Sequence, residues 1–145
     1  MIFMNTKKDA EHMQSMLQIK GIRAQRLTGD IQQGERDKII DDFRKGSYSC
    51  LISTNVLARG IDVPEVDLVI NYDVPFISSF GFKKPDYANF LHRVGRTGRF
   101  GTDGVAVSIA TDETYEDILD QIQTYYGIQM QPIKGIADIK QLLVE

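Results

Sequence analysis

This 145-residue chain has few of the residues that cross-link or anchor a protein. Its one cysteine, Cys50, excludes an internal disulfide, and two histidines without a Cys-x-x-Cys pair disfavour a structural zinc site. No apolar run approaches the roughly 18 residues that a membrane span requires. The N-terminus also lacks the basic and apolar stretches of a secretory signal. We therefore expect an intracellular protein with no metal site and no membrane contact.

Three catalytic motifs are missing as well. The chain has no Gly-x-x-x-x-Gly-Lys-Ser/Thr loop to hold the β and γ phosphates of a nucleotide. It also lacks a Gly-x-Ser-x-Gly nucleophile turn and a His-Glu-x-x-His zinc helix. The chain therefore cannot form the usual phosphate cradle from its own residues.

The composition is typical of one folded domain, with 42% apolar and 26% charged residues. A domain of this length buries about 68–70% of the surface that its unfolded chain exposes, which is enough for a core without cross-links. We expect a single domain over residues 1–145. The first predicted strand begins at Ile2 with no turn before it, which favours a chain that continues a longer protein.

The distribution of charge matters more than its total. A net charge of −3 argues against nucleic-acid binding, because such proteins are usually basic. The acidic residues concentrate in residues 112–145, however, and the segment 83–99 is rich in cations, with Asp86 as its one acid; these cations are Lys83, Lys84, Arg93, Arg96 and Arg99. The segment is compatible with a basic strip that binds phosphate groups, or with an ordinary solvated surface.

Short apolar runs alternate with amphipathic ones along the chain. Strands are predicted at 2–4, 23–27, 48–53, 68–71 and 105–110, and helices at 7–20, 33–44, 87–99, 115–126 and 136–143. Residues 76–84 are predicted to form an exposed, irregular loop. The alternation predicts a three-layer α/β domain, with a mostly parallel central sheet flanked by helices. In such a domain the loops at the carboxyl ends of the strands are expected to form the functional site.

Segment 87–99 separates apolar from cationic side chains. At about 100° per residue, one helical face holds Tyr87, Phe90, Leu91 and Val94, and the opposite face holds His92, Arg96 and Arg99. Neighbouring cations repel one another unless a highly charged anion binds, and guanidinium groups match phosphate oxygens. Arg96 and Arg99 are therefore candidates to stabilise a transferred γ-phosphoryl group. A surface helix with solvated arginines is the alternative.

Two other segments combine glycine with hydrogen-bonding side chains. Thr54, at a strand end, has a hydroxyl that can bind phosphate, unless it is only a helix cap. Asp62 has a carboxylate that can accept a hydrogen bond from a ribose hydroxyl, unless it only forms a turn. Gly29 permits close approach of a ligand to the backbone. Gln33 and Arg36 lie one helical turn apart and can donate to a nucleic-acid backbone, unless Arg36 pairs with a nearby acid.

Five motifs, in this order, closely resemble the C-terminal RecA-like domain of DEAD-box ATP-dependent RNA helicases. They are IFMNT at 2–6, LTGD at 27–30, Gln33 with Arg36, STNVLARGID at 53–62 and HRVGRTGR at 92–99. The resemblance covers nearly the whole chain. It implies a domain that closes against an N-terminal RecA-like domain of the same protein, absent from this chain, which supplies the phosphate loop. ATP and single-stranded RNA would bind across the two domains.

The resemblance also implies a role for each matched residue. Arg96 and Arg99 would contact the γ-phosphate and Asp62 the ribose, with Mg²⁺ held mainly by the N-terminal domain. His92 and Arg59 would couple the two domains. The RNA sugar-phosphate backbone would be held by Gly29, Gln33, Arg36 and Thr54. ATP binding would close the cleft and bend one RNA strand, and hydrolysis would reopen it.

Some features depart from the usual pattern of that family. Asn55 stands where many relatives have Asp, Thr28 where many have His, and residues 76–84 lengthen a usually short link. The long link and the sequence KPDY at 84–87 are similar to those of the mRNA-export subgroup. Its members work in the cytoplasm or nucleus, at the nuclear pore, and are stimulated by an export factor with inositol hexakisphosphate.

Two other interpretations remain open from the sequence. One is a non-enzymatic helicase-like module that binds RNA or a regulatory protein and never pairs with an ATPase half. The other is a DNA-translocating relative, disfavoured because HRVGRTGR at 92–99 has the RNA-helicase form. We expect a monomer, since no self-complementary apolar patch is evident.

Overall fold

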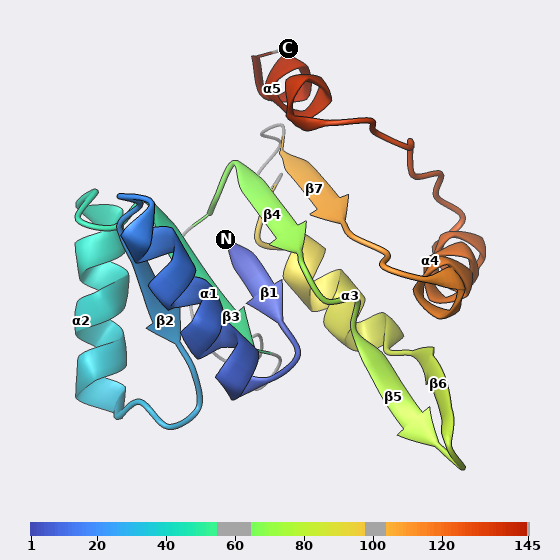
Figure 1. The fold of residues 1–145 in the computed structure, drawn as a ribbon, viewed down its shortest axis with the longest axis horizontal. Helices are drawn as coiled ribbons and strands as arrows, with labels where there is room; N and C mark the ends of the chain where they lie inside the picture. The colour runs from blue at the N-terminus through green and yellow to red at the C-terminus, as the bar shows by residue number, and fades with distance from the viewer. Residues whose placement is uncertain (55–64, 98–103, 145) are drawn as a thin grey trace.

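The computed structural model describes residues 1–54, 65–97 and 104–144, and Figure 1 shows the course of the chain. Its strands are β1 (Ile2–Met4), β2 (Ala24–Leu27), β3 (Cys50–Thr54), β4 (Leu68–Asn71), β5 (Phe76–Ser79), β6 (Phe82–Pro85) and β7 (Val105–Ser108). Its helices are α1 (Lys7–Ile19), α2 (Gln33–Arg44), α3 (Tyr87–Val94), α4 (Glu113–Tyr126) and α5 (Ile136–Val144). None of the helices in these ranges is long and apolar enough to cross a membrane.

The central sheet has five strands in the order β2-β3-β1-β4-β7. All four neighbouring pairs are parallel, with Met4 opposite Thr54 and Leu27 opposite Ser53 in register. Because the strands run the same way, the carboxyl ends of β1, β2, β3 and β4 lie at one edge of the sheet. The predicted parallel α/β domain is confirmed.

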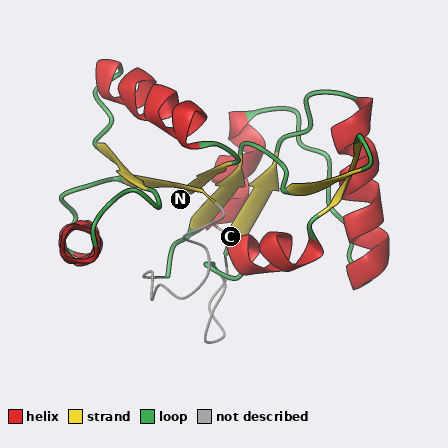
Figure 2. Ribbon diagram, turned by 90° about the horizontal axis from the view of Figure 1, so that it is seen from below, coloured by secondary structure: helices red, strands yellow, loops and turns green. Residues whose placement is uncertain are grey.

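Helices cover both faces of this sheet, as Figure 2 shows. On one face Met4, Ala24 and Ile52 pack against α1, which contributes the buried Ala10. On the other face Leu27 and Leu51 pack against α2, which contributes Ile39 and Ile40. Neighbouring residues of one strand, such as Leu51 and Ile52, point to opposite faces, so one short apolar strand supplies both layers of core.

A separate apolar cluster joins α3 to α4. Phe90 of α3 and Ile118 and Ile122 of α4 are almost fully buried around Val74, which lies just after β4. The hydroxyl of Tyr126 donates to the backbone carbonyl of Tyr87 at 2.7 Å. This cluster fixes α3 against α4, next to the sheet.

Three predictions about this region are wrong. Residues 76–84 belong to a two-stranded antiparallel sheet, β5-β6, and do not form an irregular loop. Leu91, expected among the anchoring apolar residues of α3, is 51% exposed. Arg93, expected in the exposed basic strip, is fully buried.

Candidate functional site

The carboxyl edge of the sheet brings together most of the predicted phosphate-binding residues that the structure describes. Gly29 follows β2, Thr54 ends β3, and Gln33 and Arg36 lie in the first turn of α2. Because β2 and β3 are parallel neighbours in the sheet, their carboxyl ends are adjacent. Segments well separated in the sequence thus form one polar edge.

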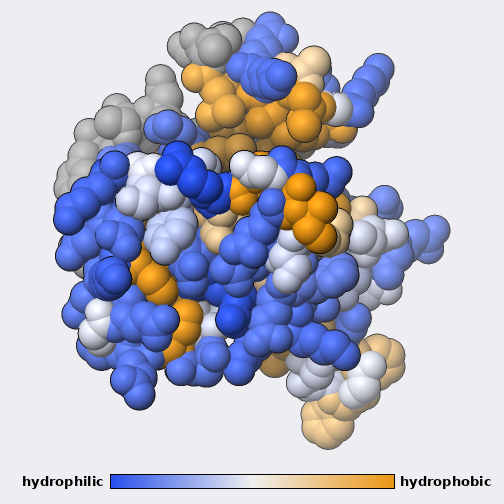
Figure 3. Space-filling view, turned by 60° about the vertical axis from the view of Figure 1, so that its left-hand side comes forward, coloured by the Kyte–Doolittle hydropathy of each residue, from blue (hydrophilic) through white to orange (hydrophobic). Residues whose placement is uncertain are grey.

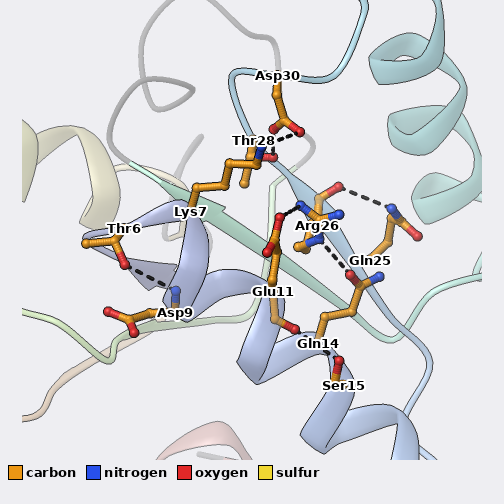
Figure 4. A network of polar contacts seen from close by, with 10 residues as sticks. All are labelled: Thr6, Lys7, Asp9, Glu11, Gln14, Ser15, Gln25, Arg26, Thr28 and Asp30. Atoms are coloured by element: carbon orange, nitrogen blue, oxygen red, sulfur yellow. Dashed lines mark hydrogen bonds and ion pairs between the residues drawn. The ribbon is translucent and has the colours of Figure 1, made fainter.

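The loop after β2 is held by a polar network, which Figure 4 shows. The buried hydroxyl of Thr28 donates to the carboxylate of Asp30, and Lys7 of α1 lies 3.0 Å from the same carboxylate. The hydrogen bonds from Thr28 and Lys7 lower the pKa of Asp30 from 3.8 to about 2. Asp30 is therefore ionised at neutral pH, and it ties the loop that contains Gly29 to α1.

Arg36 and Gln33 lie next to this loop. Nη2 of Arg36 donates to the carbonyl of Gly29 at 3.0 Å, and Nε2 of Gln33 donates to Asp37 at 3.0 Å. The N-cap of this helix is Gln32, and Asp30 does not cap it. The contact with Gly29 fixes the guanidinium of Arg36 beside the loop, where a nearby phosphate would meet a positive charge.

Thr54 ends the most buried strand of the sheet. It is 7% exposed, and the hydroxyl of its neighbour Ser53 donates to the carbonyl of Leu27 at 3.2 Å. This buried bond joins the ends of β2 and β3. Asp62 and Arg59, which follow in the sequence, lie outside the described residues.

His92 and Arg96 form a second group, at the end of α3. The helix begins at the cap Asp86, whose carboxylate accepts from the backbone N–H of Asn89 at 3.2 Å, and it ends before Gly95. Nε of Arg96 donates to the carbonyl of His92 at 3.3 Å. The predicted partner Arg99 lies outside the described residues.

Arg96 is distant from the carboxyl edge along the strands. Its carbonyl accepts from the backbone N–H of Val66 at 3.0 Å, and Val66 precedes β4. Arg96 is therefore near the amino end of β4, whereas Gly29 and Thr54 lie at the carboxyl ends of β2 and β3. The predicted site residue Arg96 therefore does not lie on the loops at the carboxyl ends, where the site was expected.

Arg93 is a buried residue that sequence reasoning did not include in the site. Its guanidinium donates to the carbonyl of Asp73 at 2.6 Å and to the side-chain oxygen of Asn5 at 2.8 Å. It also lies over the ring of Phe3, 5.3 Å from the centroid. Arg93 follows the buried Phe90 by three residues, so helical spacing contained a signal that it faces inward. The contacts fix α3 to the ends of β1 and β4.

Arg93 keeps its positive charge although it is buried. Burial lowers the pKa of Arg93 from its ordinary value to about 10, while the nearby charges of Asp73 and Asp86 raise it. The guanidinium therefore stays protonated at neutral pH. The part of the chain that the structure describes contains no group of three or more His, Cys, Asp and Glu side chains arranged to hold a metal ion.

Comparisons with known proteins agree on one family. Residues 1–101 match the model of the helicase conserved C-terminal domain. The chain is 48% identical over 126 residues to the ATP-dependent RNA helicase DBP5 of Saccharomyces cerevisiae, which covers 87% of this chain and 26% of that protein. The chain thus spans about a quarter of the length of this curated relative.

Solved structures are similar over most of the chain. The C-terminal domain of the DEAD-box protein Dbp5 has a TM-score of 0.81 and 48% identity, over 87% of this chain and 68% of that one. S. cerevisiae Dbp5 bound to RNA and ADP BeF3 has a TM-score of 0.87 and 43% identity, over 99% of this chain and 37% of that one. An S. cerevisiae Dbp5 variant bound to Nup159, a Gle1 variant, IP6 and ADP has a TM-score of 0.83 and 40% identity, over 99% of this chain and 38% of that one.

Proposed function

This chain belongs to the family of helicase conserved C-terminal domains, and on that basis we propose that it is the C-terminal half of a DEAD-box ATP-dependent RNA helicase. The full-length protein is an RNA-stimulated ATPase that unwinds RNA locally or remodels RNA–protein complexes. The observation that supports this most is the polar carboxyl edge, where Arg36 is fixed beside Gly29. A relative that is similar over 99% of this chain binds RNA and ADP BeF3.

RNA binds at the carboxyl edge in this proposal. Gly29, Gln33, Arg36 and Thr54 hold the sugar-phosphate backbone of a single strand. Such contacts give affinity without base selectivity, and contact with ribose hydroxyls favours RNA over DNA.

ATP binds between this domain and the N-terminal half in this proposal. Arg96 and Arg99 contact the γ-phosphate and Asp62 the ribose, while His92 and Arg59 couple the two halves. Guanidinium groups keep their charge at neutral pH, so they can stabilise the charge that develops on a transferred phosphoryl group. Mg²⁺ is held mainly by the N-terminal half.

The regulatory partners and the location follow from the same relatives. We propose an export factor with inositol hexakisphosphate as the activator, and action in the cytoplasm or nucleus at the nuclear pore. The relative bound to Nup159, Gle1 and IP6 supports this, because it is similar over 99% of this chain.

Replacement of Arg36 tests the RNA site. In Arg36→Ala, affinity for a single-stranded oligouridylate should fall severalfold, and the slope of log affinity against log salt should decrease by about 0.7, because one phosphate contact is lost. The measurement is fluorescence anisotropy at several salt concentrations. Lys38→Ala is the matched control, since it removes an exposed cation from the same helix outside the proposed site. An unaltered affinity and slope in Arg36→Ala would remove Arg36 from the RNA site.

A further inference from the structure

The β5-β6 hairpin projects beyond the carboxyl edge of the sheet, as Figure 1 shows. Its strands pair Ile77 with Lys84 and Ser79 with Phe82, and a two-residue turn of Phe80 and Gly81 joins them. The hairpin exposes large apolar side chains at its end: Phe80 is 97% exposed, Phe82 72% and Ile77 53%. In Figure 3 the hairpin is the apolar projection at the lower right.

The backbone conformation of Phe80 is unfavourable for an aromatic residue. Phe80 has a φ of 49° and Gly81 a φ of 78°, so both turn residues are left-handed. This conformation suits Gly, Asn or Asp, whereas a bulky residue adopts it at an energetic cost. The exposed ring recovers none of that cost by burial. Folding of the domain thus gives no reason for an aromatic side chain at this position, and binding of a ligand does.

The two faces of the hairpin have different surroundings. On one face, Nζ of Lys83 donates to the hydroxyl of Tyr115 at 3.0 Å and lies 4.7 Å from the centroid of the Phe76 ring. That face is anchored to α4. The alternation of side chains along paired strands puts Ile77, Phe82 and Lys84 on the opposite, open face. The open face therefore combines apolar side chains with a cation.

Charge on the hairpin favours a polyanion over other ligands. Residues 76–85 contain Lys83 and Lys84 and no acidic residue, although the whole chain is acidic. Asp112, the N-cap residue of α4, acts through its charge on Lys83 of the anchored face. A phosphate backbone is thus repelled from the anchored face and attracted to the open one.

The hairpin also continues the edge where RNA is proposed to bind. It starts five residues after the end of β4, at the same edge as the carboxyl ends of β2 and β3. β4 is three strands away from β2 in the sheet order. A strand of RNA that crosses Arg36 and Thr54 along this edge runs toward the hairpin.

We propose that the open face and tip of the β5-β6 hairpin form a second contact for single-stranded RNA, in which bases stack on Phe80 and Phe82 and a phosphate pairs with Lys84. Aromatic rings that stack bases beside a cation are the usual means of binding a single strand without sequence preference. The inference rests on the proposed RNA function and adds a contact outside the family motifs.

Tryptophan fluorescence tests stacking directly, because the chain has no tryptophan of its own. In Phe80→Trp of the whole 145-residue chain, a 12-nucleotide oligouridylate should quench the fluorescence as it binds. Ile19→Trp is the matched control, since Ile19 is 86% exposed at the end of α1, near the opposite edge of the sheet. Its fluorescence should not change.

An affinity measurement complements the fluorescence. The double variant Phe80→Ala with Phe82→Ala should bind the oligouridylate about tenfold more weakly, with an unchanged salt slope because neither side chain is charged. Ile19→Ala should bind like the unmodified chain. Quenching at position 80 together with this loss supports the inference.

Failure of the inference and failure of the proposed function have different signatures. If Arg36→Ala weakens binding while the hairpin variants show neither quenching nor lost affinity, the hairpin is not an RNA contact, and its exposed rings fit a protein partner instead. If the unmodified chain does not bind the oligouridylate, the proposed RNA function and the hairpin contact are both contradicted.

Discussion

At the scale of single residues, Arg93 is the clearest case of a charge used for structure. Its guanidinium is fully buried and binds acceptors on Asn5 and Asp73, so it joins α3 to two strands of the sheet. Arg96 follows on the next turn. The position of the proposed phosphate-contacting residue therefore depends on a neighbour that contacts no ligand in the proposal.

Removal of Arg93 should destabilise the domain strongly. Arg93→Ala leaves buried acceptors without a donor and should lower the free energy of unfolding by about 3 kcal/mol, measured by urea denaturation. Arg44→Ala, which removes an exposed arginine that pairs with Asp41, should change it by less than about 0.5 kcal/mol. Equal midpoints for Arg93→Ala and the unmodified chain would show that the buried contacts do not stabilise the fold.

The network around Asp30 predicts a pH dependence. The pKa of Asp30 is about 2 in the folded state, below its ordinary 3.8, so its stabilising contribution is present above about pH 4 and is lost as the pH falls toward 2. Carbon-13 NMR of the carboxyl group should report this low value. Thr28→Val and Lys7→Ala should each raise the pKa of Asp30, whereas Lys8→Ala should not. A titration near 3.8 in the unmodified protein would contradict the network.

Sequence reasoning succeeded for residues whose relation is local. Gln33 and Arg36 were expected one helical turn apart, and both lie in the first turn of α2. It failed for Arg93 because the acceptor on Asn5 is 88 residues away in the sequence. No local pattern shows that such a partner will be near, and a charged residue is rarely buried unless it is paired.

At the scale of elements, the β5-β6 hairpin shows where a sequence pattern is insufficient. Its turn is Phe-Gly, whereas two-residue hairpin turns are usually recognised by Asn-Gly or Asp-Gly. Ser78 and Ser79 also weaken the strand signal. In contrast, each predicted end of a core strand lies within two residues of the observed end. A short apolar run between two helices clearly indicates where a strand begins and ends.

The ends of most helices were also readable, because their caps use local side chains, but α3 was predicted to reach residue 99 and ends at Val94. At the start of α1 the hydroxyl of Thr6 accepts from the backbone N–H of Asp9 at 3.1 Å. At the start of α4 the carboxylate of Asp112 accepts from the N–H of Tyr115 at 3.1 Å, and the helix ends at Gly127 with a φ of 63°.

The cap at Asp112 provides a test at this scale. Asp112→Ala leaves a backbone donor of α4 without its acceptor and should lower the free energy of unfolding by about 1 kcal/mol. Asp112→Asn retains an acceptor oxygen and should lower it by less. Thermal unfolding followed by circular dichroism measures both variants. If the two lose the same stability, the cap bond does not contribute.

At the scale of the whole molecule, the sheet separates two kinds of residue. Gly29, Arg36 and Thr54 lie at the carboxyl edge, and Arg96 lies near the amino end of β4. In the proposed function, RNA and the nucleotide are held at these different places of one domain. Cys50, the one cysteine of the chain, is half-buried at the start of β3, where burial raises the pKa of its thiol.

The division of the function between two halves is the central claim. RNA-stimulated ATP hydrolysis, measured side by side for the full-length protein, its Arg96→Ala variant and the isolated 145-residue chain, tests it most directly. The full-length protein should hydrolyse ATP with RNA present, Arg96→Ala should be slower by about 10³ to 10⁵, and the isolated chain should be inactive. Unchanged turnover in Arg96→Ala, or RNA-stimulated turnover by the isolated chain, would contradict the claim.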